Sequence, residues 1–257
     1  MFAAFLLVMA VGVACDSGSK PATPIPSPVP TVSNDRDGDG IPNDADACPD
    51  EKEDHRWSTE DDGCPDTIAD LVGLAREDID GFWQRTFEKH SLRYTGPHDF
   101  VGYDEPIRTA CGRAEMENAF YCPVDHAIYY DITFFQGELE RSGDFGPVFI
   151  VAHEWGHLVQ ALLGLLQDPE RYTIDNELQA DCFAGVYSAD ADSRDLLEAG
   201  DMDEAVLSLL RAGDPLDTPF FDEDAHGSPG ERIDAFLRGT QQGLDSCLKP
   251  LRRSALR

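Results

Sequence analysis

The segment HEWGH at positions 153–157 places two histidines four positions apart, and Glu177 follows twenty positions after the second histidine. Histidines at this spacing project from one face of a helix, so His153 and His157 can ligate the same zinc ion. We predict Glu177 as the third ligand and Glu154 as the general base that takes a proton from zinc-activated water. A set of two histidines and one glutamate leaves a coordination position open, which is typical of hydrolytic rather than structural zinc.

A second carboxylate, Asp181, lies four positions after Glu177 and therefore on the same face of a helix. One carboxylate can bind the metal while the other accepts a hydrogen bond from a ligand imidazole, which fixes the tautomer of that ring. We predict that Asp181 holds His153 in this way. The alternative is that HEWGH occurs by chance in a structural helix, which would leave the carboxylate helix after it unexplained.

Hydrophobic periodicity indicates the helices that must carry these residues. Apolar residues recur at three- and four-residue steps over about 67–90 and 145–166, and the second of these helices contains the zinc motif. A further helix over about 175–187 carries the two carboxylates. Later helices are predicted over about 202–212 and 228–243, the last one opening with the capping sequence SPGE.

Between the first two helices, the sequence predicts little regular structure and one strand. Residues 91–125 are rich in Gly, Pro and polar side chains, which indicates irregular structure, whereas the aromatic and β-branched residues at 126–135 predict a strand. The expected fold class is therefore α+β, mostly helical with a small sheet. We expect this domain to span 67–250.

An acidic segment at 34–66 precedes the helical part. Its aspartates alternate with glycines, and a twelve-position loop runs from Asp35 to Asp46. Alternating carboxylates direct oxygens at a hard cation such as Ca²⁺, while glycines permit the tight turns. The predicted calcium ligands are Asp35, Asp37, Asp39, the carbonyl of Ile41, Asn43 and Asp46. The segment resembles a thrombospondin type 3 calcium repeat, which implies an irregular calcium-binding spacer; a solvated acidic linker is the alternative.

Residues 1–15 resemble a secretory signal with a lipobox-like end. The first fourteen residues are almost wholly apolar, too few to span a bilayer but suited to the apolar part of a signal peptide. Small residues before Cys15 predict lipidation of that cysteine; an ordinary cleaved signal is the alternative. The Pro- and Ser-rich linker at 16–33 would then tether an exported lipoprotein of a bacterial cell envelope, facing the periplasm or the exterior.

The remaining six cysteines form an even set, as expected for disulfides in an oxidising compartment. Two pairs each bracket a short segment, and they leave a third pair over. The pairings that we favour are Cys48–Cys64, Cys111–Cys122 and Cys182–Cys247.

The longer sequences HEWGHLVQ and ELQADCFAG together resemble the bacterial neutral zinc metallopeptidase family. Further matching segments are ACG at 110–112, FYCP at 120–123 through YYD to FF at 134–135, and HGS at 226–228 with ERI and the final Cys247. The resemblance covers about 66–250 and implies a zincin-like fold in which a small sheet packs on the motif helix. An edge strand, expected at 126–134, would pair with an extended peptide.

The residues and the resemblance together imply a mechanism. Zinc lowers the pKa of its water toward ~7, and Glu154 takes the proton and passes it to the leaving amine. The developing oxyanion needs a second donor, for which His226 is the candidate; the alternative is a surface histidine at a helix start. Arg232 is expected to anchor a carboxylate, either Glu177 or Asp181.

We therefore expect an extracytoplasmic zinc-dependent peptidase that acts on polypeptides. A formal net charge of −30 argues against nucleic acid and anionic membrane surfaces as partners, so membrane contact is expected only through the lipid anchor. The alternative is a non-catalytic envelope protein with a structural zinc site and an acidic interaction segment. A zinc amidase acting on peptidoglycan cross-bridges would share the site. Glu154 favours catalysis, because a purely structural site does not need it.

Overall fold

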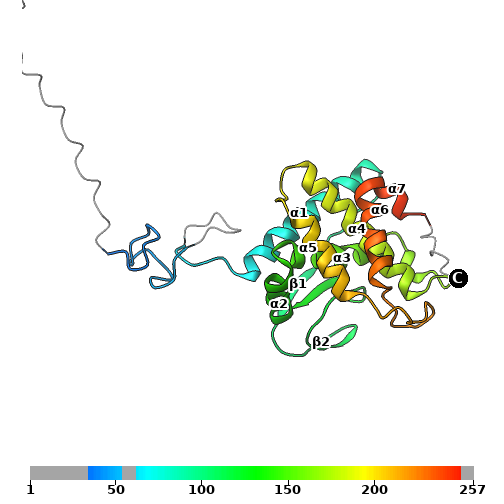
Figure 1. Ribbon diagram of the computed structural model, residues 1–257, viewed down its shortest axis with the longest axis horizontal. Helices are drawn as coiled ribbons and strands as arrows, with labels where there is room; N and C mark the ends of the chain where they lie inside the picture. Colours follow the sequence, from blue (N-terminus) through cyan, green and yellow to red (C-terminus); the bar gives the residue numbers. More distant parts are fainter. Residues whose placement is uncertain (1–33, 54–61, 250–257) are drawn as a thin grey trace, which may run out of the picture.

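The computed structural model describes residues 34–53 and 62–249, so the predicted signal, the linker and Cys15 lie outside the described residues. The described part is mostly helical with a small sheet, as predicted (Figure 1). Its helices are α1 (Ile68–Lys89), α2 (Ile132–Ser142), α3 (Phe145–Leu162), α4 (Thr173–Ser193), α5 (Asp201–Ala212), α6 (Pro229–Gln242) and α7 (Leu244–Cys247). Its strands are β1 (Asp99–Tyr103), β2 (Ile107–Thr109), β3 (Gly112–Ala114), β4 (Ala119–Cys122) and β5 (Ala127–Asp131).

Helix α3, which contains HEWGH, lies at the centre of the domain. It packs against α1, α2, α4 and α5 and also contacts strand β4. Its apolar side chains are buried in the main core, with Trp155, Leu158 and Val159 fully excluded from solvent. The motif helix is therefore held on several sides by other elements, which fixes the direction of its polar residues. It ends at Leu162, four residues before the predicted end, because Gly164 takes a left-handed conformation and a 3-10 turn, η1 (Leu165–Gln167), follows.

The sheet has the strand order β1-β5-β4, with β1 parallel and β4 antiparallel to β5. The prediction that 126–134 forms an edge strand is wrong, since β5 is the central strand and β4 is the edge next to α3. Irregular structure throughout 91–125 is also wrong, because four strands lie there, two of them in the separate β2–β3 hairpin. These strands have only three to five residues and no regular alternation of burial, so they have little sequence periodicity.

The predicted strand at 126–135 ends at Asp131, and α2 begins directly after it. The Asp131 carboxylate accepts hydrogen bonds from the backbone N–H groups of Thr133 and Phe134 and so caps the helix. The apolar run continues across this boundary because Phe135 is a buried core residue on α2. A capping side chain within an aromatic run therefore marks a change of structure that composition alone does not reveal.

Glycines bring three helices into close contact around the motif. A Cβ placed on Gly156 of α3 would lie 2.7 Å from the Cα of Ala180 on α4. A Cβ on Gly239 of α6 would lie 2.0 Å from the carbonyl oxygen of Cys182, also on α4. Because both distances are shorter than real Cβ contacts, α3, α4 and α6 approach through positions that have no side chain.

The three predicted disulfides are present: Cys48–Cys64, Cys111–Cys122 and Cys182–Cys247. The first closes the acidic segment, which lies at one end of the molecule outside the helical body (Figure 1). The second ties the β2–β3 hairpin to the edge strand. The third connects α4 to α7 and so fixes the end of the domain to the carboxylate helix.

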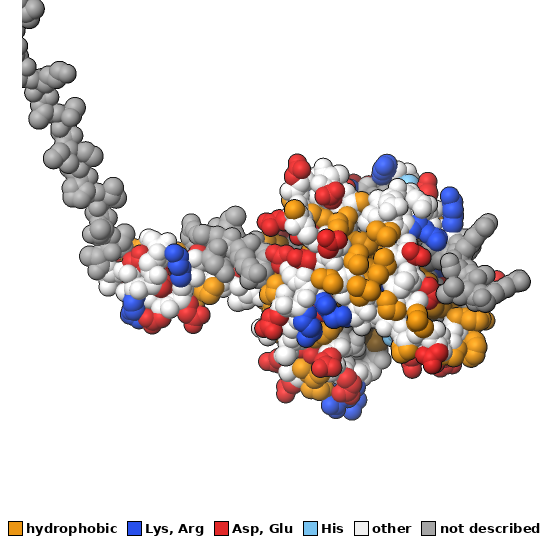
Figure 2. All heavy atoms as spheres, in the orientation of Figure 1, with side chains coloured by type: hydrophobic (Ala, Val, Ile, Leu, Met, Phe, Trp, Pro, Cys, Tyr) orange, Lys and Arg blue, Asp and Glu red, His pale blue; other side chains and the backbone are white. Residues whose placement is uncertain are grey.

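On the face seen in Figure 2, acidic side chains are spread over both the acidic segment and the helical body, in keeping with the net charge of −30. Among residues 34–53 and 62–249, no helix combines the length and the apolar character needed to cross a bilayer.

Candidate metal centre and active-site cleft

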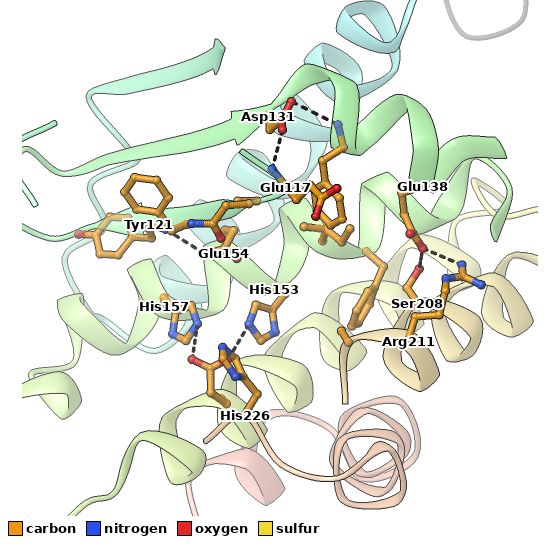
Figure 3. Close-up of a pocket in the computed structure, with 18 of the residues that line it drawn as sticks. Glu117, Tyr121, Asp131, Glu138, His153, Glu154, His157, Ser208, Arg211 and His226 are labelled. Atoms are coloured by element: carbon orange, nitrogen blue, oxygen red, sulfur yellow. Dashed lines mark hydrogen bonds and ion pairs between the residues drawn. The ribbon is translucent and has the colours of Figure 1, made fainter. Parts of the chain in front are cut away.

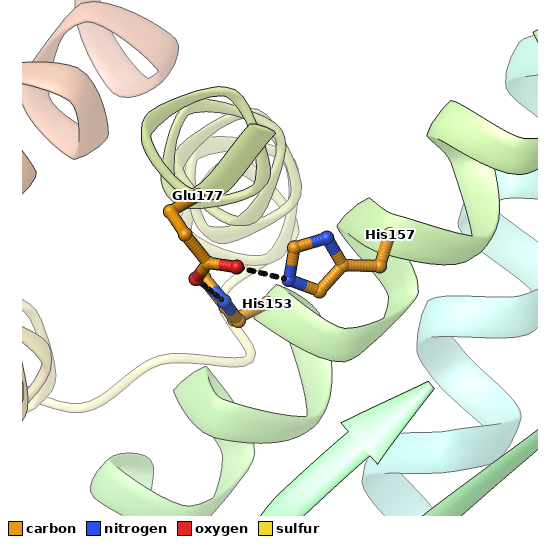
Figure 4. A group of neighbouring side chains, drawn as sticks. All are labelled: His153, His157 and Glu177. Atoms are coloured by element: carbon orange, nitrogen blue, oxygen red, sulfur yellow. Dashed lines mark hydrogen bonds and ion pairs between the residues drawn. The ribbon is translucent and has the colours of Figure 1, made fainter. Parts of the chain in front are cut away.

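His153, His157 and Glu177 come together between α3 and α4 (Figure 4). The Glu177 carboxylate lies between the two rings, with Oε2 3.2 Å from Nε2 of His153 and Oε1 3.3 Å from Nε2 of His157. One ligand atom of each side chain lies within 4.8 Å of the other two. The helices therefore bring the predicted histidine and carboxylate donors to a single point.

The second nitrogen of each ring is already occupied. Nδ1 of His153 lies 2.8 Å from Oδ1 of Asp181, and Nδ1 of His157 lies 2.9 Å from Oε1 of Gln160. Both partners are acceptors, so each ring carries a proton on Nδ1, and Nε2, which now faces Glu177, is the nitrogen left to ligate a metal ion at the central point. Two imidazole nitrogens and one carboxylate are the donor set of hydrolytic zinc, and the residues present fit that ion.

Asp181 is itself held by Arg232, which hydrogen-bonds both carboxylate oxygens through Nε and Nη2, each at 2.9 Å. Of the two carboxylates considered for Arg232, the structure therefore pairs it with Asp181. Both side chains are buried, and Nη1 of Arg232 also donates to the carbonyl of Ala212 at the end of α5. The position of His153 thus depends on a chain of contacts from α5 and α6 through α4.

Glu154 lies beside the donor set and is buried. Its Oε2 accepts a hydrogen bond of 2.9 Å from the backbone N–H of Tyr121 on the edge strand. Figure 3 shows Glu154 between strand β4 and the two histidines, with its carboxylate at the wall of the cleft. The hydrogen bond from Tyr121 fixes the Glu154 carboxylate to the edge strand of the sheet.

Burial and charge shift the pKa values of these groups in opposite directions. Burial raises the pKa of Glu154, although the two histidines partly oppose this. Burial would also raise that of Glu177, but the adjacent His157 and His153 outweigh it and hold the pKa well below its usual value. Burial disfavours protonated His153, yet Asp181 and Glu177 raise its pKa to about 10 in the metal-free protein. A dicationic metal would replace the protons that now balance these buried carboxylates.

The donor set opens onto a cleft of about 1190 Å³. One wall is formed by residues 116–121, which lead into and include most of β4, and another by Phe149, Ile150, His153 and Glu154 of α3. The cleft continues past the metal donors to residues of α2 and α5. This volume accommodates several residues of an extended polypeptide.

The family described as "Putative neutral zinc metallopeptidase" matches residues 43–248. The chain belongs to this family. The zinc metallopeptidase match begins within the acidic segment and ends after Cys247, so it includes the whole cleft and all three disulfides.

Two curated proteins have sequences similar to this chain. The uncharacterized protein YpfJ of Escherichia coli K12 is 33% identical over 201 residues, which are 72% of this chain and 67% of that protein. The uncharacterized protein Rv2575 of Mycobacterium tuberculosis H37Rv is 41% identical over 107 residues, 37% of this chain and 36% of its own. No solved structure matches.

His226 lines the same cleft as the candidate metal donors His153 and His157, and Figure 3 shows all three on the same side of the pocket. Its side chain is 51% exposed and its Nδ1 lies 3.6 Å from Oδ1 of Asp214. Oδ2 of Asp214 accepts hydrogen bonds from the backbone N–H groups of His226 and Gly227, at 2.6 and 2.9 Å. Asp214 thus fixes the loop that carries the histidine, while the ring remains open to the cleft.

Three partners of the site were not anticipated from the sequence. Gln160 follows His157 by three positions, so helical spacing carried a signal for this contact. Asp214 is twelve positions from His226, and no motif connects them. The N–H of Tyr121 that holds Glu154 is a backbone group, and it has no sequence signal at all.

The acidic segment brings three of its six predicted calcium ligands together. Carboxylate oxygens of Asp35, Asp37 and Asp39 lie within 4.8 Å of one another. Asp46 is buried, and Oδ2 of Asp37 and of Asp46 are buried atoms without a hydrogen-bond partner. Burial raises the pKa of Asp46, and the three other aspartates raise it further. Carboxylates brought together in this way, with two buried oxygens that accept no hydrogen bond, fit a divalent cation.

The two other predicted calcium contacts have defined positions in this loop. Oδ1 of Asn43 accepts the backbone N–H of Arg36 at 2.9 Å, so the asparagine closes the loop on itself. The N–H of Ile41 donates to Asp39 at 2.7 Å. A Cβ on Gly63 would lie 2.1 Å from Oδ1 of Asp46, so the segment joined through Cys48–Cys64 covers this carboxylate closely.

Proposed function

We propose that this protein is a zinc-dependent endopeptidase that cleaves polypeptides outside the cytoplasm. The observation that carries the proposal is the convergence of His153, His157 and Glu177 beside the buried carboxylate of Glu154, at the wall of a cleft large enough for a peptide. The two histidines and Glu177 would hold the zinc. When bound, the ion supplies Lewis-acid polarisation of water and of the scissile carbonyl.

Glu154 is proposed to take a proton from the attacking water and to give it to the leaving amine. Its raised pKa favours this exchange, since a base closer to the working pH accepts and returns a proton more readily. The N–H of Tyr121 holds the carboxylate in one orientation, so that the proton acceptor is in place before the substrate arrives.

The edge strand β4 is proposed to align the substrate. The carbonyl of Asn118 accepts from the N–H of Asp131 at the end of β5, whereas the N–H of Tyr121 turns the other way, toward Glu154. Alternation along the strand therefore directs the backbone groups of Ala119 away from β5 and toward the cleft that this residue lines. An extended peptide can pair with such an edge.

His226 is proposed to donate a hydrogen bond to the oxygen on which negative charge develops. Its exposed ring, its place beside the zinc donors and the contact with Asp214 support this role.

The deciding experiment compares wild type with Glu154→Gln in the full chain, measuring bound zinc and cleavage of an unfolded protein such as reduced casein. We expect about one zinc in each and a loss of activity of roughly 10³-fold in the variant. Glu140→Gln, an exposed change on α2, is the matched control and is expected to cleave normally. Equal cleavage by wild type and Glu154→Gln would leave the non-catalytic envelope protein as the better reading. Activity on purified cell wall but not on casein would favour the amidase.

We further propose that residues 34–66 bind calcium and stiffen the chain between the membrane and the catalytic domain. The clustered aspartates and the two buried, unpartnered oxygens support this part of the proposal. The proposal also includes export of the protein and lipidation at Cys15. Export is supported by the three disulfides, because disulfides persist in oxidising compartments. Intact-mass analysis of the exported protein is expected to find a lipid on Cys15; a mature chain that begins elsewhere would contradict this.

A further inference from the structure

The end of the cleft away from the zinc donors is built from α2 and α5 and contains a buried carboxylate, Glu138. Its Oε1 accepts hydrogen bonds from Oγ of Ser208 at 2.6 Å and from Nη2 of Arg211 at 2.9 Å, and it also contacts Oγ of Ser142. Figure 3 shows Glu138, Ser208 and Arg211 together, across the pocket from the labelled histidines. The two serines fix the carboxylate, and the carboxylate fixes the Arg211 guanidinium.

A second arginine lies at the same place. Nη2 of Arg141, near the end of α2, is 3.8 Å from the other oxygen of Glu138. Both arginines line the cleft, and their side chains are 52% and 37% exposed for Arg141 and Arg211 respectively. Two guanidinium groups therefore share one carboxylate. One cation is enough to neutralise Glu138, so this carboxylate does not balance the charge of both guanidinium groups.

The donors of Arg211 are only partly used. Within the described part of the chain, its hydrogen bonds to Glu138 and Ser142 both come from Nη2. The remaining N–H groups of a guanidinium form a planar fork that matches a carboxylate. A cation held by a buried partner and half open to a cleft is oriented for a second anion, at little further loss of side-chain entropy.

We propose that Arg141 and Arg211 form a subsite, called here the arginine subsite, that binds a carboxylate of the polypeptide substrate. The inference rests on the proposed peptidase function, for which it supplies a substrate class. The carboxylate comes from an acidic side chain or from the C-terminus of the substrate. Since the subsite and Glu154 are both fixed to the fold, the carboxylate must lie at a constant distance from the cleaved bond.

The negative charge of the rest of the molecule limits the positions in the cleft at which an acidic residue of the substrate is accepted. The chain has 50 acidic and 20 basic residues, so its overall field repels acidic peptides. Two arginines directed into the cleft oppose that field locally, where a substrate must enter. Away from these arginines and from the metal donors, the cleft is lined by the carboxylates Glu117 and Asp131, which disfavour an acidic side chain placed there.

The test uses the zinc-loaded full chain and a peptide library prepared from a digested proteome, with cut sites identified by mass spectrometry. We expect Asp and Glu, or a free C-terminus, to be enriched at one fixed position relative to the cut. Synthetic peptides with Glu or Gln at that position, each with a free or an amidated C-terminus, then separate the two sources. The expected preference for the carboxylate is on the order of tenfold in kcat/KM.

Arg141→Gln and Arg211→Gln are both expected to reduce this ratio toward one, and Arg141→Glu is expected to favour Lys at the same position. Because Arg211 also neutralises buried Glu138, its loss lowers stability, and Arg141→Gln provides the second, more exposed variant. Arg108→Gln, an exposed change on the β2–β3 hairpin, is the matched control and should keep the wild-type ratio.

The outcomes separate this inference from the proposed function. Cleavage without any carboxylate preference, or a preference unchanged in both arginine variants, would overturn the arginine subsite and leave the peptidase intact. A zinc-loaded protein that cuts no peptide of the library would overturn both together. Loss of preference on amidation assigns the C-terminal carboxylate, whereas a preference for Glu over Gln that survives amidation assigns a side chain.

Discussion

Arg232 and Asp181 form a buried, bidentate ion pair behind the metal donors, with two nitrogen–oxygen distances of 2.9 Å. The same carboxylate contacts Nδ1 of His153 at 2.8 Å, so Asp181 connects Arg232 on α6 to the zinc motif on α3. Burial would raise the pKa of Asp181, but Arg232 and His153 outweigh it and lower the pKa, which keeps the group ionised.

Asp181→Asn should therefore weaken zinc binding by roughly 10- to 100-fold, because the amide is a weaker acceptor and its NH2 group must face a donor, either Nδ1 of His153 or the Arg232 guanidinium. Stability should decrease by roughly 3–5 kcal/mol, since Arg232 is left as an uncompensated buried charge. Competitive zinc titration and urea unfolding measure the two effects. Asp192→Asn, an exposed change on the same helix, is the control, and a zinc affinity equal to that of wild type in Asp181→Asn would contradict the assignment.

His226→Asn should lower kcat by about 100-fold while zinc content stays at the wild-type value, because the donor acts on the transition state and not on the metal. Steady-state kinetics on a fluorogenic peptide, together with metal analysis, separates these effects. His90→Asn replaces an exposed histidine far along the chain, at the end of α1, and should have no effect. An unchanged kcat in His226→Asn would remove this residue from the mechanism.

Calcium should raise the melting temperature of the wild-type protein and should bind to it in isothermal titration. Asp46→Asn should abolish both effects, because it removes charge from a buried oxygen that has no donor in the metal-free loop. Asp44→Asn, an exposed change within the same loop, should bind calcium like wild type. The absence of any calcium heat in the wild-type titration would favour the solvated-linker interpretation.

Acid should weaken the contact between α1 and α4. Burial raises the pKa of Asp78, but two hydrogen bonds from Arg194, at 2.8 and 2.7 Å, and its charge outweigh this and lower the pKa. A carboxyl whose pKa is lowered by folding stabilises the folded state above its unfolded pKa of about 3.9. This contribution disappears as the pH falls through the lower, folded value.

Asp78→Asn should accordingly lose about 1 kcal/mol of stability at neutral pH and should show a shallower decrease in stability below pH ~4. Urea unfolding at several pH values measures both quantities. Glu115→Gln breaks the exposed ion pair with Arg113 and should change stability by less than about 0.5 kcal/mol. Identical acid dependence in wild type and Asp78→Asn would show that the pair is not coupled to folding.

Removal of the Cys182–Cys247 disulfide should destabilise the protein more than removal of Cys111–Cys122. The sequence separations are 65 and 11 residues, for which loop-closure entropy gives about 4 and 3 kcal/mol. Paired Cys→Ala variants, unfolded in urea, measure the difference. Equal losses would mean that packing of α7 on α4, and not the restriction of the unfolded chain, accounts for the effect.

The sequence was sufficient for the metal donors because their geometry is local. His153 and His157 share a helix, as do Glu177 and Asp181, and helical spacing alone places each pair on one face. The only further requirement is that α3 and α4 pack against each other with these two faces in contact. The zinc family followed from the extended sequences around these helices, and the three disulfides followed from the even set of cysteines and the short segments that two of the pairs bracket.

The arginine subsite could not be predicted, because Glu138 and Arg211 are 73 positions apart and meet only through the packing of α2 on α5. Helix α2 itself was missed, since its opening residues are aromatic and β-branched, and the capping role of Asp131 depends on backbone geometry. The edge strand was misplaced for a related reason. Strand β5 is buried on nearly every residue, and such a run does not reveal whether a strand is central or at an edge.

Gly156, the fourth residue of HEWGH, has one more consequence. At Gly156, α3 and α4 are so close that only the hydrogen of a glycine fits between their backbones. A methyl group at this position would push the two helices apart. A relative with alanine at this position would keep every ligand in its sequence and still be unable to close the three donors around one ion. In this fold, the close spacing of the α3 and α4 backbones is as necessary for the metal centre as the side chains of the three donors.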